Sequence, residues 1–262
     1  ADSHWKIETN KEIFLAEKLV MATGSNPKMW DMLSEMGHTI VPPVPSLFTF
    51  NIKDPRIKEL MGVSAMASVK VKGTKLKASG PLLITHWGMS GPAILRVSAW
   101  GARELFDKSY QFTLQVNWLN DINMAECEEQ LRELKQEQAR KTVAKQSPYD
   151  FPNRLWQSLV AASGIQAETR WADLSKKQIE ALALQLTNGE YAVNGKSTFK
   201  EEFVTAGGIE LKEVDFKTMQ SKLLPAMYFA GEILNIDAIT GGFNFQNAWT
   251  GGYIAAQSIV LD

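Results

Sequence analysis

The most constraining feature of the sequence is a strand–loop–helix segment near its C-terminal end. An apolar run, Met227 to Ala230, stops at Gly231 and Glu232, and a loop containing Gly241 and Gly242 leads into a helical pattern with a polar first turn. This pattern predicts a helix that packs closely on a sheet and directs its N-terminus at the strand ends. Small or slim side chains recur at helical spacing at Ala248, Gly251, Gly252, Ala255 and Ile259.

A helix start of this kind favours an electron-rich or anionic ligand. Its unpaired backbone N–H groups carry roughly half a positive charge, so a phosphate or a reduced flavin ring is stabilised by about 0.3–1 kcal/mol per exposed contact. The alternative is a glycine-rich turn followed by an ordinary buried helix. The local pattern supports both interpretations equally.

Composition excludes several classes of function. The chain has 28 basic and 29 acidic side chains and no basic run, so we expect neither a nucleic-acid partner nor binding to a membrane surface. No apolar run reaches the roughly 18 residues of a membrane span, and the N-terminus lacks a signal-peptide layout, which predicts a cytoplasmic protein. The single cysteine, Cys127, lies in a charged helical pattern and is expected to be a semi-buried side chain, not a redox nucleophile.

The first 46 residues predict part of an α/β domain. Alternating residues from Trp5 onward predict a hairpin, Leu19 to Ala22 predict a buried strand that ends at Thr23-Gly24, and residues 25–37 predict a short helix. Ile40 to Ser46 contains three prolines and is expected to lead into another domain.

The middle of the chain predicts an inserted β-barrel and a helical subdomain. The pattern predicts one helix over Pro92–Phe106, and short strands at Leu47–Ile52, Ala67–Val71, Leu76–Ala78, Leu82–Thr85, Phe112–Trp118, Tyr191–Val193 and Glu202–Val204. Three helices are expected over 120–187, with capping pairs Asn123/Glu126 and Ser175/Gln178. The predicted domains are 1–46 with 225–262 (α/β), 47–119 with 188–224 (barrel) and 120–187 (helical). The predicted fold class is α/β for the first of these domains and α+β for the chain as a whole.

Several separate stretches resemble the HI0933-like flavoproteins, a bacterial family of NAD(P)/FAD-dependent oxidoreductases that is also described as the aminoacetone-oxidase family. The first of these stretches is Leu82-Leu83-Ile84-Thr85-His86-Trp87-Gly88-Met89-Ser90-Gly91-Pro92, which is similar to the family's Thr-His-x-Gly-Leu-Ser-Gly-Pro. The others are 22–24, 37–43, 203–209, 218–222, 228–232 and 240–249. They fall in family order and cover the chain almost end to end.

The resemblance implies a Rossmann-type FAD domain interrupted by a barrel and a small helical domain. It implies that the acidic side chain of Gly231-Glu232 hydrogen-bonds the ribityl chain of the flavin. It also implies that Thr23-Gly24 lets the backbone pass beside the cofactor. The pyrimidine side of the isoalloxazine ring would be approached by Gly241, Gly242, Phe243, Asn244, Phe245 and Gln246, where aligned N–H groups favour the reduced ring. FAD is the implied cofactor, NAD(P)H the candidate electron donor and a small organic molecule the implied substrate.

Three departures from the family pattern qualify these expectations. Ser25 follows Thr23-Gly24 where the family carries a longer glycine loop, and Asn235 and Ala238 replace the usual Asp and Gly. The sequence also contains no strand-turn-helix with Gly-x-Gly-x-x-Gly. We therefore expect the chain to be the C-terminal two-thirds of a longer enzyme and to be inactive on its own, because most of the FAD anchor is missing.

The sequence leaves the catalytic residues, the substrate and the oligomeric state open. His86 lies in a family motif but is expected to be a structural histidine bonded to a nearby carbonyl, and the histidine spacing predicts no metal site. A non-catalytic binding module is an alternative that exposed Trp118, Trp156 and Trp171 on one face would favour. An inert fragment is another.

Overall fold

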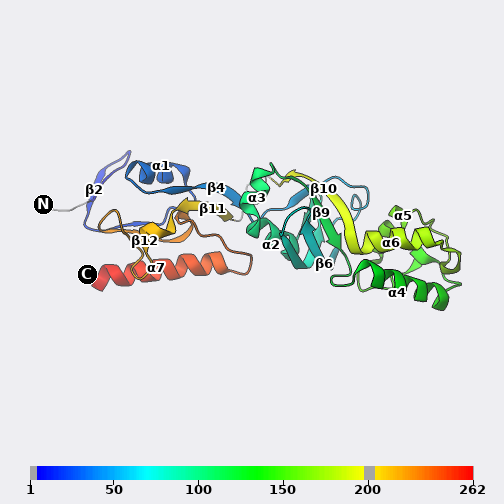
Figure 1. Cartoon of the computed structure of the whole chain (residues 1–262). Helices are drawn as coiled ribbons and strands as arrows, with labels where there is room; N and C mark the ends of the chain where they lie inside the picture. Colours follow the sequence, from blue (N-terminus) through cyan, green and yellow to red (C-terminus); the bar gives the residue numbers. More distant parts are fainter. Residues whose placement is uncertain (1–4, 198–203, 262) are drawn as a thin grey trace. The chain divides into compact units, whose positions relative to one another are not determined.

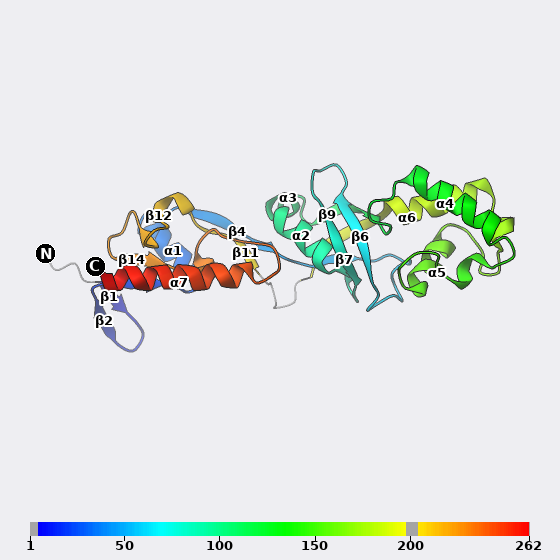
Figure 2. The same cartoon turned by 90° about the horizontal axis from the view of Figure 1, so that it is seen from below.

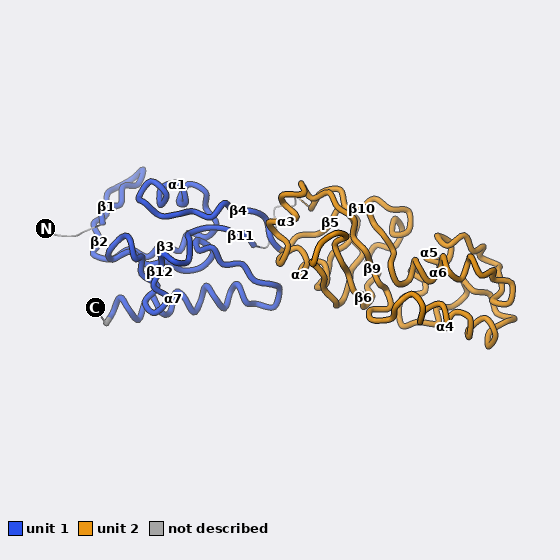
Figure 3. Tube along the Cα trace, viewed as in Figure 1, with its two compact units in different colours: residues 1–46, 202–262 blue, residues 47–201 orange. Residues whose placement is uncertain are grey.

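The computed structural model describes residues 5–197 and 204–261, and within them the protein is a mixed α/β chain with seven α-helices (Figure 1). It divides into two compact units, which are coloured separately in Figure 3. Unit 1 comprises residues 1–46 and 202–262, and unit 2 comprises residues 47–201. Of the strand predicted at Glu202–Val204, the first two residues lie outside the described part.

Unit 1 is built on a four-stranded sheet of order β12-β13-β14-β3. Strand β3 (Leu19–Met21) runs parallel to β14 (Met227–Phe229), and Met21 pairs with Phe229. Strands β12 (Val214–Asp215) and β13 (Gln220–Ser221) continue the sheet in antiparallel fashion. The described residues thus show one parallel pair in this sheet, whereas a Rossmann-type sheet needs several, so the Rossmann-type assignment stays a prediction.

Two helices belong to unit 1, together with the predicted N-terminal hairpin. Helix α1 (Pro27–Glu35) is capped by Asn26, and α7 (Phe243–Leu261) packs along β14, as Figure 2 shows. The hairpin is confirmed: β1 (Trp5–Glu8) and β2 (Ile13–Ala16) pair in antiparallel register.

The proline-rich segment expected as a connection is in fact strand β4 (Ile40–Ser46). It pairs with β11 (Val204–Ile209) in a separate two-stranded sheet, where prolines are tolerated because each strand has an unpaired edge. The register shifts at Gly207, whose φ is +137°, and a side chain there would have its Cβ 2.6 Å from Pro43 Cα. The backbone of the two strands can approach this closely only because residue 207 is glycine.

A buried histidine joins three elements of unit 1. His38 is 2% exposed; its Nδ1 lies 2.8 Å from Glu213 Oε2 and its Nε2 lies 2.9 Å from Ser221 Oγ. The Ser221 hydroxyl oxygen already accepts from the backbone N–H groups of residues 223 and 224, so its own hydrogen is free to donate to Nε2. The ring also packs edge-on against Phe229. Its contacts are therefore structural.

Unit 2 contains a closed six-stranded barrel, as the sequence predicted. Its strand order is β10-β5-β8-β7-β6-β9. Alternating buried residues along β6 and β7 fill the interior. The strands are β5 (Phe50–Ile52), β6 (Ser64–Val71), β7 (Lys77–Ile84), β8 (Gly88–Ser90), β9 (Gln111–Asn117) and β10 (Gly189–Lys196).

The barrel differs from the prediction in three places. One continuous strand, β7, replaces the two short strands expected across Gly80-Pro81, and β8 was not predicted. The expected single helix is divided into α2 (Pro92–Trp100) and α3 (Ala102–Asp107) at Gly101. A side chain at Gly101 would have its Cβ 2.4 Å from Leu76 Cδ1, so the leucine side chain would have to shift to admit it.

The remainder of unit 2 is helical. Helices α4 (Met124–Glu137), α5 (Asn153–Ala162) and α6 (Lys176–Asn188) enclose a core in which Trp156 and Trp171 stack. Both predicted capping boxes are confirmed, at Asn123/Glu126 and Ser175/Gln178. Short 3-10 helices, η1 (Val143–Lys145) and η2 (Trp171–Asp173), lie in the connections.

The structure groups residues 204–224 with unit 1, whereas the sequence pattern placed them with the barrel. The reason is long-range pairing, because β11 hydrogen-bonds to β4 and β13 to β14. Among the described residues, no helix combines the length and the apolar character needed to cross a membrane.

Candidate functional site

The parallel strands of unit 1 bring two predicted segments to the same edge of the sheet. Because β3 and β14 run in the same direction, the residues that follow them, Thr23-Gly24 and Gly231-Glu232, leave the sheet at neighbouring points. The N–H of Ala230 donates to Met21 O at 3.1 Å, so the pairing continues up to Gly231. A ligand at the carboxyl ends of these strands would meet both segments.

Helix α7 packs tightly against this edge through its small residues. Gly231 has a φ of +79°, and a Cβ at this position would lie 3.5 Å from the Cβ of Ala248. A Cβ on Gly251 would lie 3.1 Å from Met219 Cε and 3.9 Å from the Cα of Ala230. The predicted close approach of helix and sheet is confirmed, and larger side chains would force them apart.

The first turn of α7 presents free backbone donors. The N–H of Gln246 donates to Gly242 O at 2.8 Å, so the intrahelical bonds begin there. The N–H groups of Phe243, Asn244 and Phe245 precede that bond, and no side-chain oxygen of the described residues accepts from them. With 1.5 Å of rise per residue, this turn starts about 7.5 Å along the axis from Ala248. The donors lie just beyond the strand ends.

The loop before α7 is open to solvent and held in a left-handed conformation. Gly241 and Gly242 are exposed, with φ of +128° and +83°. Phe243 and Phe245 are exposed too, and Phe245 stacks on Trp249 with the ring centroids 6.0 Å apart. This loop is therefore not sealed in the hydrocarbon core.

Asn244, which the resemblance assigns to the cofactor site, holds the loop that precedes α7. Its side-chain amide is engaged at both ends by the backbone of Ala238, with Nδ2 donating to O at 3.0 Å and Oδ1 accepting from N–H at 2.9 Å. The side chain therefore closes the loop 238–244. Its backbone N–H remains available to a ligand.

Glu232 is the charged group at the strand ends. It is partly buried in η4 (Gly231–Ile233), and burial raises the pKa of its carboxyl. Among the described residues no donor is hydrogen-bonded to this carboxylate. The backbone next to it is fixed, because Trp30 Nε1 donates to Ile233 O at 2.9 Å. A half-buried acceptor held in place in this way suits a ligand that brings its own hydroxyl donors.

In unit 2, the sequence candidates have no common site. His86 is exposed beside a cavity of about 420 Å³ lined partly by Lys53 and Lys58, and its ring makes no hydrogen bond to a described residue. The expected structural bond of His86 is thus absent from the described part. Cys127 is fully buried, and burial raises the pKa of its thiol to about 11, so it stays protonated.

The proposed aromatic binding face is also absent. Trp118, Trp156 and Trp171 are between 0% and 2% exposed and belong to the core of unit 2. They therefore do not support the binding-module alternative, since a buried indole cannot stack on a ligand. The sequence pattern alone could not separate these tryptophans from exposed Trp87 and Trp249.

Comparison with known proteins identifies the larger unit. A family model described as the HI0933-like protein barrel and H2TH domain matches residues 44–204, nearly the same span as unit 2. Two similar proteins are named ribosomal RNA dihydrouridine synthase. One is from Escherichia coli (28% identical over 93% of this chain and 61% of the relative), the other from Haemophilus influenzae (28% over 97% and 63%).

A third relative has a different substrate in its name. It is the 3-dehydro-bile acid delta(4,6)-reductase of Clostridium scindens, 25% identical over 96% of this chain and 64% of the relative. The chain thus spans about three fifths of the length of these curated relatives. All three are named for reactions of oxidoreductase type, in agreement with the general enzyme class expected from the sequence.

These relatives contradict one expectation. The absence of nucleic acid among the partners was inferred from balanced charge, yet two relatives that match nearly the whole chain are named for action on ribosomal RNA. Net charge is a sum over the whole chain and is insensitive to local clusters, so it cannot exclude such a partner.

Proposed function

The chain belongs to the HI0933-like family, and from this premise we propose that it serves in a flavin-dependent reductase of carbon–carbon double bonds conjugated to a carbonyl group. The names of the relatives support this reaction class. Dihydrouridine is uridine with a saturated C5–C6 bond, which in uridine is conjugated to the C4 carbonyl. A 3-dehydro-bile acid with 4,6 double bonds carries the same electron-poor arrangement next to its 3-ketone.

The strand ends of unit 1 fit part of a flavin nucleotide. FAD carries ribityl hydroxyls, which are donors, and a pyrimidine edge that is rich in electrons when reduced. The carboxylate of Glu232, which no donor among the described residues engages, is an acceptor for the hydroxyls, and the N–H groups at the start of α7 suit the electron-rich edge. Gly24 and Gly242 have no atom within 4 Å of the position of a Cβ, so the backbone is open there.

In this proposal each predicted residue has a limited task. Glu232 orients the ribityl chain, and Gly231 keeps α7 close by having no side chain. Asn244 positions the helix start by holding Ala238 and contributes its own N–H. Thr23, Gly241, Phe243, Phe245 and Gln246 remain proposed contacts of the FAD site. A Rossmann-type domain around them and NAD(P)H as electron donor belong to the same proposal.

A bound flavin would supply the chemistry, which is delivery of a hydride to one carbon of the double bond while a proton is added to the other. The chain's own contribution is to favour the electron-rich flavin by aligned N–H groups and to exclude bulky groups from the strand ends. We propose that the double bond is that of a uracil base in RNA, because the relatives with the higher identity are named for that product.

The observation that carries the proposal is the convergence of Glu232 and the α7 N-terminus at the ends of two parallel strands. The test is a visible absorption spectrum of the purified protein titrated with FAD, both as the 262-residue chain and together with any flanking sequence of its gene. Retention of a yellow flavin, lost in Glu232→Ala and kept in Glu35→Ala, is expected. Protein that stays colourless in both forms would contradict the assignment.

The substrate is tested separately. Ribosomal RNA fragments incubated with the FAD-loaded protein and NAD(P)H should gain 2 Da at uridine, as measured by mass spectrometry of the nucleosides. A 3-oxo-4,6-diene steroid serves as the competing substrate. Reduction of the steroid with unchanged RNA would keep the reaction class and reject the RNA substrate.

A further inference from the structure

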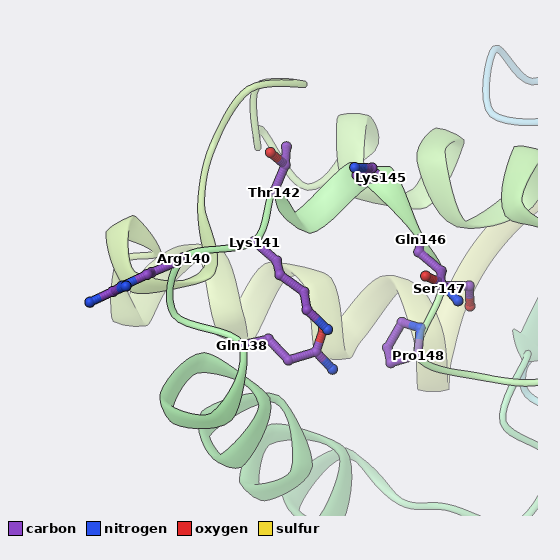
Figure 4. Close-up of a pocket in the computed structure, with 8 residues that line it drawn as sticks. All are labelled: Gln138, Arg140, Lys141, Thr142, Lys145, Gln146, Ser147 and Pro148. Atoms are coloured by element: carbon purple, nitrogen blue, oxygen red, sulfur yellow. The ribbon is translucent and has the colours of Figure 1, made fainter.

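The helical part of unit 2 contains a basic cleft in the segment that connects α4 to α5. Figure 4 shows its lining, in which Gln138 and Lys141 extend toward the hollow and Ser147 and Pro148 lie across from them. The cavity measures about 600 Å³. All its lining residues come from one connecting segment: Gln138, Arg140, Lys141, Thr142, Lys145, Gln146, Ser147 and Pro148.

The charged side chains of this segment are all positive. Residues 138–148 carry three basic side chains and no acidic one. Arg140, Lys141 and Lys145 are exposed, and none of them forms an ion pair with a described residue. Neighbouring cations differ: Arg132 pairs with Glu128, and Arg170 pairs with Asp173 at 2.9 Å. The cleft therefore concentrates three positive charges for which the described residues provide no ion-pair partner.

The backbone that carries these cations is fixed. The side chain of Val143 is buried, and its backbone carbonyl accepts a hydrogen bond from Trp156 Nε1 at 2.8 Å. The N–H of Trp171 donates to Lys141 O at 3.0 Å, and Asn153 Nδ2 donates to Lys145 O at 3.1 Å. Because the frame is already ordered, an anion that binds here does not have to order the loop.

We propose that this cleft binds the phosphate backbone of the RNA substrate. Lysine and arginine contact phosphates as charged donors, and the Thr142 hydroxyl and the Gln146 amide add neutral donors of the kind that position a nucleic-acid backbone. The cleft lies within the part of the chain that matches the family domain. This inference rests on the proposed function, since it presumes that RNA is the partner.

The test measures RNA binding by fluorescence anisotropy. The probe is a labelled 20-nucleotide RNA stem–loop with uridines in the loop, titrated with the full chain over a series of salt concentrations. In Lys141→Gln/Lys145→Gln, binding should weaken by about tenfold, and the slope of log K against log salt should become shallower by roughly 1.4, or about 0.7 per single-strand phosphate contact.

The matched control is Lys176→Gln/Lys177→Gln, which removes the same charge from α6 outside the cleft. It should change the affinity by less than about twofold, because distant exposed charges are screened by salt. Equal weakening in both double variants would show a general charge effect and would overturn the proposal. Displacement of the RNA by low-millimolar inorganic phosphate at constant ionic strength would also overturn it, since the cleft would then be a small-anion site.

The FAD titration distinguishes failure of the flavin proposal from failure of the RNA-cleft proposal. Cleft-dependent RNA binding by a protein that takes up no FAD would support the cleft and reject the flavin assignment. A yellow protein whose RNA affinity is unchanged by the cleft substitutions would reject the cleft alone.

Discussion

Asn244 and Ala238 are joined by both ends of one side-chain amide, with Nδ2 donating to the Ala238 carbonyl at 3.0 Å and Oδ1 accepting from its N–H at 2.9 Å. This pair fixes the loop that enters α7 and sets the direction of the first free N–H groups of the helix. The Asn244 side chain thereby positions the helix start that we propose as part of the flavin site.

Replacing Asn244 by alanine should loosen this loop. Two hydrogen bonds are lost and the backbone groups of Ala238 are left without these partners, so we expect a loss of about 1–2 kcal/mol in the local opening free energy. Hydrogen exchange of the amides in 236–242 measures it. Asn247→Ala, on the same helix and with no hydrogen bond to a described side chain, is the control. Equal protection in both variants would show that the amide pair is unimportant.

Glu232→Gln should stabilise the unliganded protein while weakening FAD binding. Burial raises the pKa of Glu232 above its ordinary value of 4.5. The contribution of this carboxyl to folding stability is therefore complete below pH 4.5, where it is protonated, and is lost as the pH rises through the raised pKa. The neutral amide removes this loss. We expect the unfolding free energy at pH 7 to rise by up to about 1 kcal/mol, with solvent screening keeping it small.

Urea denaturation of Glu232→Gln between pH 4 and pH 8 provides the measurement. Glu35→Gln, at an exposed position of α1, removes the same charge and should leave the pH dependence unchanged. A pH profile of Glu232→Gln that superimposes on the wild-type profile would show that the Glu232 carboxylate is not destabilising.

His38→Ala should destabilise unit 1 by about 1–3 kcal/mol, because Glu213 and Ser221 each lose a partner. Burial by itself would raise the pKa of Glu213, but hydrogen bonds from Thr39 and His38 outweigh it and hold that pKa below 4.5. The resulting stability is present above pH 4.5 and is lost as the pH falls through the lowered pKa.

The His38→Ala variant should therefore lose less stability on acidification than the wild type. Thermal unfolding at pH 7 and pH 3 shows both effects. Exposed His86→Ala is the control, with an expected change within about 0.5 kcal/mol. If the two histidine variants have the same melting temperature, the buried network does not stabilise the fold.

Gly207→Ala should disrupt the pairing of β4 with β11. The added Cβ would lie 2.6 Å from Pro43 Cα and 2.8 Å from Pro42 O, at a φ of +137° that alanine avoids. We expect a loss of more than about 2 kcal/mol, measured by chemical denaturation. Gly252→Ala is the contrast: it lies in α7 with no atom within 4 Å, and should gain up to about 1 kcal/mol.

Elements that depend on neighbouring residues were predictable from the sequence. Both capping boxes, the N-terminal hairpin and the alternation of the barrel strands follow from local hydrogen bonds and from side-chain periodicity, which a short window contains. The strand–loop–helix at the C-terminal end was predictable for the same reason, because glycines, a carboxylate and a small-residue stripe stand at fixed spacing.

Other features were decided by tertiary structure. The proline segment is strand β4 because it pairs with β11, and the break between α2 and α3 lies at Gly101, where Leu76 packs. His38 is structural because it meets Glu213 from 175 residues away. No short window contains such a contact.

Sequence by itself determined most of the helices, the alternation of the barrel strands and the small-residue face of α7, since these rest on interactions between near neighbours. Tertiary structure alone decided that Thr23-Gly24 lies beside Gly231-Glu232, that Asn244 is engaged by Ala238, and that three cations of 138–148, which form no ion pair with a described residue, line one cleft. The physical reason is that burial, pairing and charge compensation depend on which distant residues meet, and only the folded chain brings them together.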